Sequence, residues 1–266
     1  MNGPAIVVGG SEGIGASAAE ALAARGTDVA ILSRSADKLA AELERLEGQR
    51  TTTGQQLLTA EVDVRDGPGT QAAIDGVVER LGRAPALFVV AAGYARPGWF
   101  GEQPLDEVEG MIATNLLGTI HACRAVLPHL RAAGGGAIVT TSSMAGLAGV
   151  FGYTAYSATK FGVIGFSEAL RREVKPFGIT VQVLCPPNTR TPGFDEENRH
   201  KPPEVLAAEE SVKTLEPDEV AAVLLKALGK RRFLVVPGRD SRLAAVAIRH
   251  APALVDRALR RPAPKP

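Results

Sequence analysis

Tyr156 and Lys160 lie four residues apart in a stretch of helical periodicity, and Ser143 precedes the tyrosine by thirteen positions. Residues four apart share one face of a helix, so the phenol and the ammonium can point into the same cleft. A free phenol has a pKa of about 10, and a cation about 4 Å away in a shielded cleft favours the phenolate by about three pKa units at most. The pair therefore predicts an acid–base site near neutral pH, although a tyrosine–lysine pair considered alone is better explained as an ordinary amphipathic helix.

A glycine-rich segment joins the first apolar run, residues 5–8, to an alanine-rich helical stretch at residues 16–25. The order of strand, glycine turn and helix is typical of pyrophosphate binding, because glycine allows close backbone approach and the helix start favours negative charge. The alternative is a tight turn without a ligand. We expect the turn to bind a dinucleotide through Gly9, Ser11, Glu12, Gly13, Ile14 and Gly15.

The end of the second predicted strand, residues 28–32, indicates which dinucleotide binds. An NAD-selective site would place an acidic side chain there to accept a hydrogen bond from the ribose 2′-OH. This sequence has Ser33 and Arg34 instead, and Lys38 follows one turn into the next helix. The planar fork of an arginine suits a phosphate. We therefore expect NADP(H), unless both cations are only exposed surface charges.

Two further strand ends are expected to border the cofactor. The third predicted strand ends at Asp63 and Val64, where the aspartate could either bond the adenine amino group or cap a turn. The unbroken apolar run at residues 86–91 is typical of a central parallel strand. It ends at Ala92 and Gly93, whose small side chains would admit the cofactor.

Asn115 and Ser143 are polar residues in otherwise apolar surroundings. Asn115 falls within a helical stretch at residues 105–130, where a polar amide needs partners, so it is either a structural residue or part of a proton relay. Ser142 and Ser143 follow the predicted strand 137–141. They lie at the carboxyl edge of the sheet, where open α/β sheets bind their ligands.

The glycine turn, Asn115, Ser143 and the Tyr156–Lys160 pair resemble, in this order and spacing, the short-chain dehydrogenase/reductase superfamily. The resemblance implies a three-layer, doubly wound, mainly parallel seven-stranded sheet (Rossmann fold) and a nicotinamide cofactor bound partly by Tyr156 and Lys160. It also implies that Ser143 bonds the substrate carbonyl, Tyr156 donates the proton, Lys160 lowers the tyrosine pKa and holds the ribose, and Asn115 holds a relay water. Ser142 is the neighbouring alternative to Ser143.

Two positions depart from the superfamily pattern. Val8 stands where a threonine usually precedes the first glycine, and Val90 and Ala91 replace the two asparagines that usually follow the fourth strand. Side-chain hydrogen bonds that usually brace the central strand are therefore missing, and the turn must be satisfied in another way. No catalytic group is lost.

Residues 186–202 and 151–161 resemble the corresponding segments of 3-ketodihydrosphingosine reductases. This narrower resemblance implies NADPH-dependent reduction of 3-oxosphinganine to sphinganine, with Pro186, Thr189 and Thr191 against the nicotinamide half of the cofactor. Another substrate, such as a 3-oxoacyl thioester or an aliphatic ketone, is the alternative within the enzyme class. A non-catalytic nucleotide-binding regulator is the alternative outside it.

Residues 187–216 are expected to form a lid over the substrate. Four prolines, at positions 187, 192, 202 and 203, should limit helix continuation and shape a loop, and Phe194 offers an apolar contact. An amino ketone entering a dry cleft needs a counter-charge, so we expect Glu196 or Glu197 to pair with its 2-ammonium group. For each glutamate alone, a solvated lid charge is the simpler interpretation.

A helix at residues 216–228 and a strand at 233–236 should complete a reductase domain spanning residues 1–238. Residues 239–266 form a basic amphipathic tail without a run of about 20 apolar residues that could span a bilayer. Such a tail could lie on a membrane surface, which would suit a lipid-like substrate, or pack on a neighbouring subunit. We expect a homo-oligomer, a dimer or tetramer.

Composition excludes several classes of function. Thirty basic and 29 acidic residues give a formal charge of +1, so we expect no nucleic-acid partner, and the four histidines lack metal-ligand spacing. Cys123 and Cys185 lie in apolar segments and predict buried free thiols. With no signal peptide expected before the first strand, these features predict a cytoplasmic protein, with peripheral membrane association as an addition.

Overall fold

The computed structural model describes residues 3–210, 212–230 and 232–259 and contains a seven-stranded sheet in the order β3-β2-β1-β4-β5-β6-β7. Every neighbouring pair is parallel, which confirms the predicted fold class. Ser211 of the predicted lid and residues 260–266 of the predicted tail lie outside the described residues. The strands are β1 (Ala5–Val8), β2 (Val29–Ser33), β3 (Leu57–Glu61), β4 (Leu87–Val90), β5 (Gly136–Thr141), β6 (Ile179–Leu184) and β7 (Leu234–Val235).

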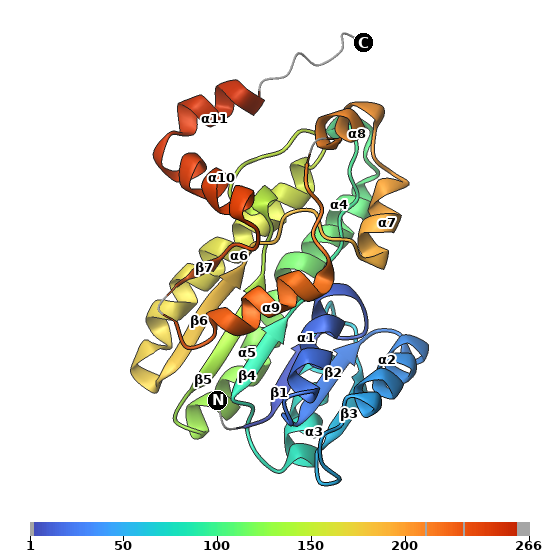
Figure 1. Cartoon of the computed structure of the whole chain (residues 1–266), viewed down its shortest axis with the longest axis vertical. Coiled ribbons are helices and arrows are strands. Elements are labelled where there is room, and N and C mark those ends of the chain that lie inside the picture. Colours follow the sequence, from blue (N-terminus) through green and yellow to red (C-terminus); the bar gives the residue numbers. More distant parts are fainter. Residues whose placement is uncertain (1–2, 211, 231, 260–266) are drawn as a thin grey trace.

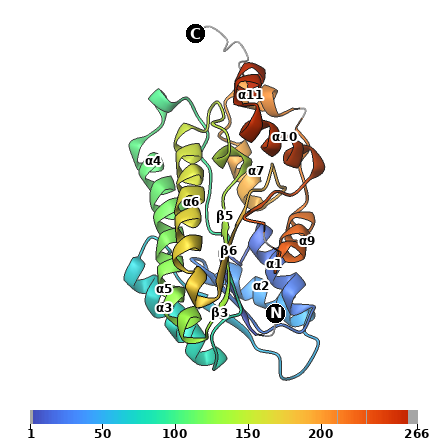
Figure 2. The ribbon, with the colours of Figure 1, turned by 90° about the vertical axis from the view of Figure 1, so that its left-hand side faces the viewer.

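Helices cover both faces of the sheet, as Figure 2 shows from the side. One face packs against α1 (Gly13–Ala23), α2 (Ala36–Gly48) and α9 (Pro217–Ala227). The other packs against α3 (Gly67–Leu81), α5 (Gly118–Ala132) and α6 (Thr154–Glu173). Because side chains alternate along a strand, Val7 enters the first core and Ile6 the second, and β1 and β4 are buried on both faces.

The predicted helix at residues 105–130 is divided in the structure. It consists of α4 (Leu105–Met111), a π-helical segment η2 (Ile112–Leu117) and α5. A π-helical turn is wider than an α-helical turn and often occurs at functional sites. Here it contains Asn115, which is fully buried. The short 3-10 helices are η1 (Phe100–Glu102), η3 (Met144–Gly146) and η4 (Lys175–Phe177).

The lid region contains two short helices, α7 (Pro192–Asn198) and α8 (Pro203–Glu209), where the sequence predicted only a shaped loop. That expectation is wrong because Pro192 and Pro203 occupy first-turn positions. There the missing N–H has no helical partner to lose, and the fixed φ suits the helix. Thr191 caps α7 by accepting a hydrogen bond from the Phe194 N–H at 3.0 Å.

Two helices follow the last strand, α10 (Arg239–His250) and α11 (Pro252–Leu259), and Pro252 is the first residue of the second helix. Figure 1 shows α7, α8 and α10 gathered at the same end of the molecule. On α10, Leu243 is 70% exposed and Val246 is 58% exposed. Among the described residues, no helix is both long and apolar enough to cross a membrane.

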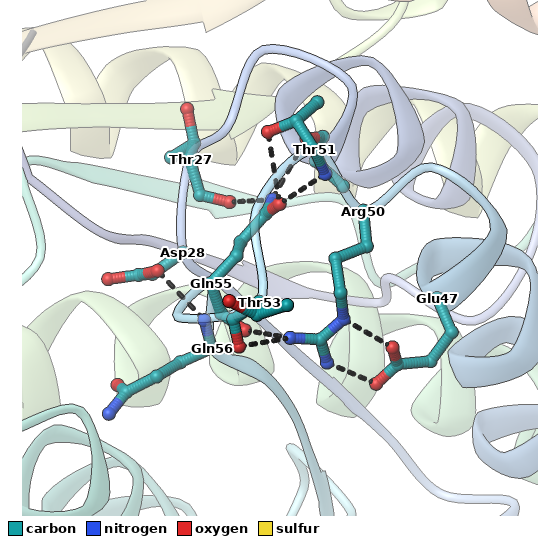
Figure 3. A network of polar contacts seen from close by, with 9 residues as sticks. Thr27, Asp28, Glu47, Arg50, Thr51, Thr53, Gln55 and Gln56 are labelled. Atoms are coloured by element: carbon teal, nitrogen blue, oxygen red, sulfur yellow. Dashed lines mark hydrogen bonds and ion pairs between the residues drawn. The ribbon is translucent and has the colours of Figure 1, made fainter.

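A polar network around Gln55, shown in Figure 3, lies where the chain enters β2 and β3, at the amino ends of these strands. The buried Gln55 amide donates to the carbonyl oxygens of Ala23 at 2.9 Å and Thr27 at 2.7 Å. Arg50 pairs with Glu47 through two contacts of 2.6 Å. The Gln55 bonds tie together the segments that lead into β2 and β3.

Candidate active site

A cavity of about 1340 Å³ lies at the carboxyl edge of the sheet, running from the glycine turn to the lid and the start of α10. Its size exceeds the roughly 300–1,000 Å³ of most small-molecule sites, which suits a dinucleotide together with a second ligand. Most of the predicted site residues line it. They are Gly9, Ser11, Glu12, Gly13, Ile14, Gly15, Ser33, Arg34, Val64, Ala92, Gly93, Ser143, Tyr156, Lys160, Pro186, Thr189, Thr191, Phe194 and Glu197.

Two predicted cofactor residues do not line the cavity. Lys38 pairs with Glu12 at 2.6 Å. Asp63 pairs with Arg65 at 2.6 Å, and hydrogen bonding from that guanidinium lowers the pKa of the aspartate. The carboxylate of Asp63 is thus bound within its own turn, as the turn-capping alternative predicted. Its neighbour Val64 reaches the cavity.

The glycine turn has the close packing that a dinucleotide site requires. Gly9 has a φ of +79°, and a Cβ there would lie 2.4 Å from the Ala92 nitrogen. A Cβ on Gly15 would lie 2.1 Å from the Gly9 carbonyl oxygen. Glu12, the residue before α1, makes no side-chain capping bond. The N–H groups of the first turn therefore remain available to a phosphate.

Arg34 stands at the end of β2 on the cavity wall and is exposed. Within the described part of the chain, its guanidinium forms no ion pair, whereas Lys38 is already paired. Beside it, the Ser11 hydroxyl donates to the Ser33 hydroxyl at 2.8 Å, which joins the glycine turn to the end of β2. This arrangement leaves Arg34 as the cation best placed for a ribose phosphate.

Lys160 and Tyr156 face the cavity from one side of α6. Lys160 is buried, donates to the Thr141 carbonyl at 3.1 Å, and lies over the Tyr156 ring, 5.5 Å from its centroid. Burial raises the pKa of Tyr156, the Glu197 carboxylate adds to this effect, and a hydrogen bond with Ser143 opposes it. Burial lowers the pKa of Lys160 to about 8.

The direction of the tyrosine shift is opposite to the one expected from the sequence. Helical spacing does bring Lys160 to Tyr156, but above the ring, and its charge does not offset the cost of burying a phenolate. In this structure the phenol therefore remains protonated near neutral pH. That is the form a proton donor needs.

The two neighbouring serines have different partners. Ser142 donates its hydroxyl proton to the Lys160 carbonyl at 2.8 Å and is buried. Ser143 bonds Tyr156 and also accepts from the Ala145 N–H at 3.1 Å. Only the Ser143 hydroxyl is thus placed beside the phenol, so the structure brings Ser143 into the site and gives Ser142 a backbone contact.

Asn115 does not line the cavity but braces its wall. Its side-chain oxygen accepts from the Tyr94 N–H at 2.9 Å, and its amide donates to the Tyr94 carbonyl at 2.9 Å and to the Thr159 hydroxyl at 3.2 Å. A Cβ on Gly93, the residue before Tyr94, would lie 2.9 Å from the Asn115 side-chain oxygen and 3.2 Å from the Lys160 ammonium. The two bonds to Tyr94 satisfy its N–H and C=O groups after β4, where this chain lacks the two asparagines of the superfamily pattern.

The two lid glutamates differ in placement. Glu196 is half-exposed and pairs with Arg199 at 2.7 Å. Glu197 lines the cavity and approaches the Tyr153 hydroxyl at 2.6 Å, as does Glu209 at 2.9 Å. Tyr153 precedes Tyr156 by three residues, a spacing that could have indicated a shared helix face. No comparable spacing in the sequence could have indicated Glu209, because its position depends on how α8 packs over the site.

The start of the predicted tail also reaches the cavity. Gly238, Arg239, Asp240, Ser241 and Ala244 line it together with residues of the sheet and the lid. No sequence pattern indicated this contact, since nothing local ties residue 239 to the glycine turn. The first turns of α10 therefore belong to the wall of the site.

The family model for short chain dehydrogenases matches residues 4–202, so the chain belongs to that family. It is an oxidoreductase of a family whose members bind nicotinamide cofactors. Over 242 residues it is 37% identical to the 3-dehydrosphinganine reductase of Danio rerio, covering 90% of this chain and 73% of that relative. It is 36% identical over 236 residues to the 3-ketodihydrosphingosine reductase of Bos taurus, covering 88% of this chain and 71% of the relative.

Solved structures show the same architecture. Levodione reductase superposes with a TM-score of 0.81 at 24% identity, covering 90% of this chain and 98% of the other, a likeness of fold. An alcohol dehydrogenase from Thermococcus sibiricus, complexed with 5-hydroxy-NADP, superposes with a TM-score of 0.74 at 26% identity, covering 88% and 95% of the two chains.

Proposed function

We propose that this oxidoreductase reduces 3-oxosphinganine (3-ketodihydrosphingosine) to sphinganine with NADPH. The observation that carries the proposal is the likeness to 3-dehydrosphinganine reductases over 90% of the chain. A D-threitol dehydrogenase of Mycolicibacterium smegmatis is equally similar, at 37%, but only over 182 residues, or 68% of the chain. The longer match favours the lipid substrate over a small polyol.

The side chains at the cavity suit reduction of a ketone. Ser143 donates a hydrogen bond to the carbonyl oxygen, and Tyr156 transfers its proton to that oxygen as negative charge develops there. When bound, a reduced nicotinamide supplies the hydride that the carbonyl carbon accepts. Lys160 would hold the ribose of the bound cofactor and stabilises the tyrosinate left behind, while Asn115 keeps the Tyr94 backbone in place.

The glycine turn, Arg34 and the segment from Pro186 to Thr191 are proposed to hold NADP(H). Arg34→Ala should raise the Kd of NADPH about 10–100-fold, because a charge-assisted bond to the 2′-phosphate is lost, and change NADH binding by less than about threefold. Fluorescence titration of both dinucleotides measures this. Lys38→Ala is the comparison variant, and its effect should be small because Lys38 is paired with Glu12. Equal losses for NADPH and NADH would contradict the assignment.

The substrate is tested by comparing rates of NADPH oxidation with 3-oxosphinganine, an acetoacetyl thioester and a simple aliphatic ketone. We expect the highest kcat/KM for 3-oxosphinganine. A higher value for either of the others would support the alternative of a different carbonyl substrate. Turnover of none, with NADPH bound, would support a nucleotide-binding regulator.

We further propose that α10 contacts a membrane surface from the cytoplasmic side, beside the mouth of the cavity. Leu243 and Val246 are exposed on one side of the helix, and Arg242 and Arg249 supply positive charge for anionic headgroups. The rival proposal is that the same face packs on another subunit of a dimer or tetramer. In either case the buried free thiols Cys123 and Cys185 fit a reducing compartment.

Charged substitutions on α10 separate these proposals. Leu243→Glu together with Val246→Glu should abolish co-sedimentation with anionic liposomes if α10 binds the membrane. Leu105→Glu on α4 is the control, because Leu105 is 69% exposed. Unchanged liposome binding would contradict the membrane contact, and a smaller sedimentation coefficient of the double variant would favour subunit packing.

A further inference from the structure

Four side chains, those of Tyr153 before α6, Glu197 on α7, Lys201 between α7 and α8, and Glu209 on α8, form a hydrogen-bonded cluster beside Tyr156. The Tyr153 hydroxyl lies 2.6 Å from Glu197 Oε1 and 2.9 Å from Glu209 Oε1. The Lys201 ammonium lies 3.2 Å from Glu197 Oε1 and 2.7 Å from Glu209 Oε2. Tyr153, Glu197 and Glu209 all line the cavity, and the side chain of Lys201 is only 1% exposed.

This cluster has more acceptors than donors. The Tyr153 hydroxyl carries one proton, which cannot satisfy two carboxylates at once. Asn188 gives Glu209 an additional bond of 3.0 Å, but among the residues that the structure describes Glu197 receives only Tyr153 and Lys201. With both carboxylates ionised, one ammonium faces two negative charges. The cluster is therefore short of one positive charge, on the side that faces the cavity.

Two further observations point to the same deficit. Burial raises the pKa of Glu197, the neighbouring Glu209 acts in the same direction, and the bonds from Tyr153 and Lys201 only oppose these effects. Glu204, which also lines the cavity, has a buried Oε2 atom with no hydrogen-bond partner among the described residues. A buried carboxylate without a full set of donors is costly unless a cation or a proton completes it.

The cluster is also close to the proposed reacting group. Tyr153 precedes Tyr156 by one helical turn, and their ring centroids are 5.8 Å apart. The Glu197 carboxylate is near enough to affect the ionisation of Tyr156. A cation held by Glu197 would therefore lie close to a carbonyl oxygen that accepts the Tyr156 proton. That is the arrangement of a ketone with an ammonium group on the adjacent carbon.

We propose that Glu197 and Glu209 receive the ammonium group of an amino ketone substrate and make the site selective for it. This inference rests on the proposed reductase function and identifies the residues that set its substrate class. The ammonium supplies three N–H donors and the missing charge, while Lys201 keeps the two carboxylates together. Tyr153 positions Glu197 through its hydroxyl.

Glu196 provides a matched control on the same helix. It is half-exposed and already bound to Arg96 at 3.5 Å, Arg199 at 2.7 Å and His200 at 3.0 Å. It is also absent from the described lining of the cavity, whereas Glu197, one position later, is part of it. Glu196→Gln and Glu197→Gln therefore remove the same charge from adjacent positions, and only one of them faces the substrate.

The test compares kcat/KM for 3-oxosphinganine with kcat/KM for the hydroxy ketone of equal chain length that lacks the amine. In the parent protein the ratio should favour the amine by about 10–100-fold, the value of a buried charge-assisted contact. Glu197→Gln and Glu209→Gln should each reduce this ratio about tenfold or more, mainly through KM. Glu196→Gln should keep the parent ratio. NADPH affinity and Tm of each variant verify that the protein is folded.

A parent ratio near one, or a ratio that Glu197→Gln does not change, would overturn the inference and leave the reductase function intact. An equal loss with both ketones would mean that the cluster only holds the lid, and would overturn it too. If the parent reduced neither ketone, the proposed function itself would fail, and the inference with it. The outcomes are thus distinguishable in one set of assays.

Discussion

Tyr156→Phe should lower kcat/KM for ketone reduction by about 10³-fold, the middle of the range for a lost general acid. The substitution removes the hydroxyl that bonds Ser143 and faces the cavity, and it keeps the aromatic ring over which Lys160 lies. Because burial raises the phenol pKa, the parent donates from the protonated form, and no other phenol or carboxylic acid is expected to replace it efficiently. Steady-state rates of NADPH oxidation measure the loss.

The control for this variant is cofactor binding. NADPH should still bind to Tyr156→Phe, as followed by quenching or transfer of protein fluorescence, which shows that the loss lies in the chemical step. Turnover equal to that of the parent would contradict the role of Tyr156. It would shift the assignment of proton donor to another residue.

Gly15→Ala should lower the stability of the protein and weaken NADPH binding at the glycine turn, the end of the cavity away from Tyr156. The added Cβ would lie 2.1 Å from the Gly9 carbonyl oxygen and 3.2 Å from the Ala91 Cβ, so the glycine turn must move. Overpacking of this kind costs about 1–3 kcal/mol of stability, and a displaced turn can no longer bring its backbone to a pyrophosphate. We expect a lower Tm and a Kd for NADPH raised about 10²-fold, equivalent to about 2.7 kcal/mol.

Gly48→Ala is the matched control, because a Cβ at Gly48, the last residue of α2, meets no atom within 4 Å. It should leave NADPH binding unchanged. Parent-like affinity of Gly15→Ala would contradict the assignment of the glycine turn to the cofactor. A loss of stability without a loss of affinity would show that the turn only packs α1 against the sheet.

The sequence predicted the fold wherever the signal was local. The apolar runs at residues 5–8 and 86–91 became central strands because parallel strands covered on both faces must be apolar throughout. The glycine turn followed from spacing alone. The lid helices were missed because proline was treated as a helix breaker, whereas Pro192 and Pro203 each occupy the first turn of a helix.

The site could be predicted only in part, for a similar reason. Tyr156 and Lys160 are one helical turn apart, so their approach follows from local geometry. Glu209 and Ser241 reach the same cavity from elements whose docking is fixed by tertiary packing, and no local pattern marks them. The sign of the tyrosine pKa shift was also beyond the sequence, because it depends on burial as well as on the position of the neighbouring charge.

The most direct test of the proposed function is isotope transfer. NADPH carrying deuterium at the transferable position of its nicotinamide is incubated with the protein and 3-oxosphinganine, and the product is analysed by mass spectrometry. The proposal predicts sphinganine with one deuterium at the former carbonyl carbon, formed by the parent and suppressed in Tyr156→Phe. Sphinganine without the label, or no sphinganine while another ketone is reduced, would contradict it.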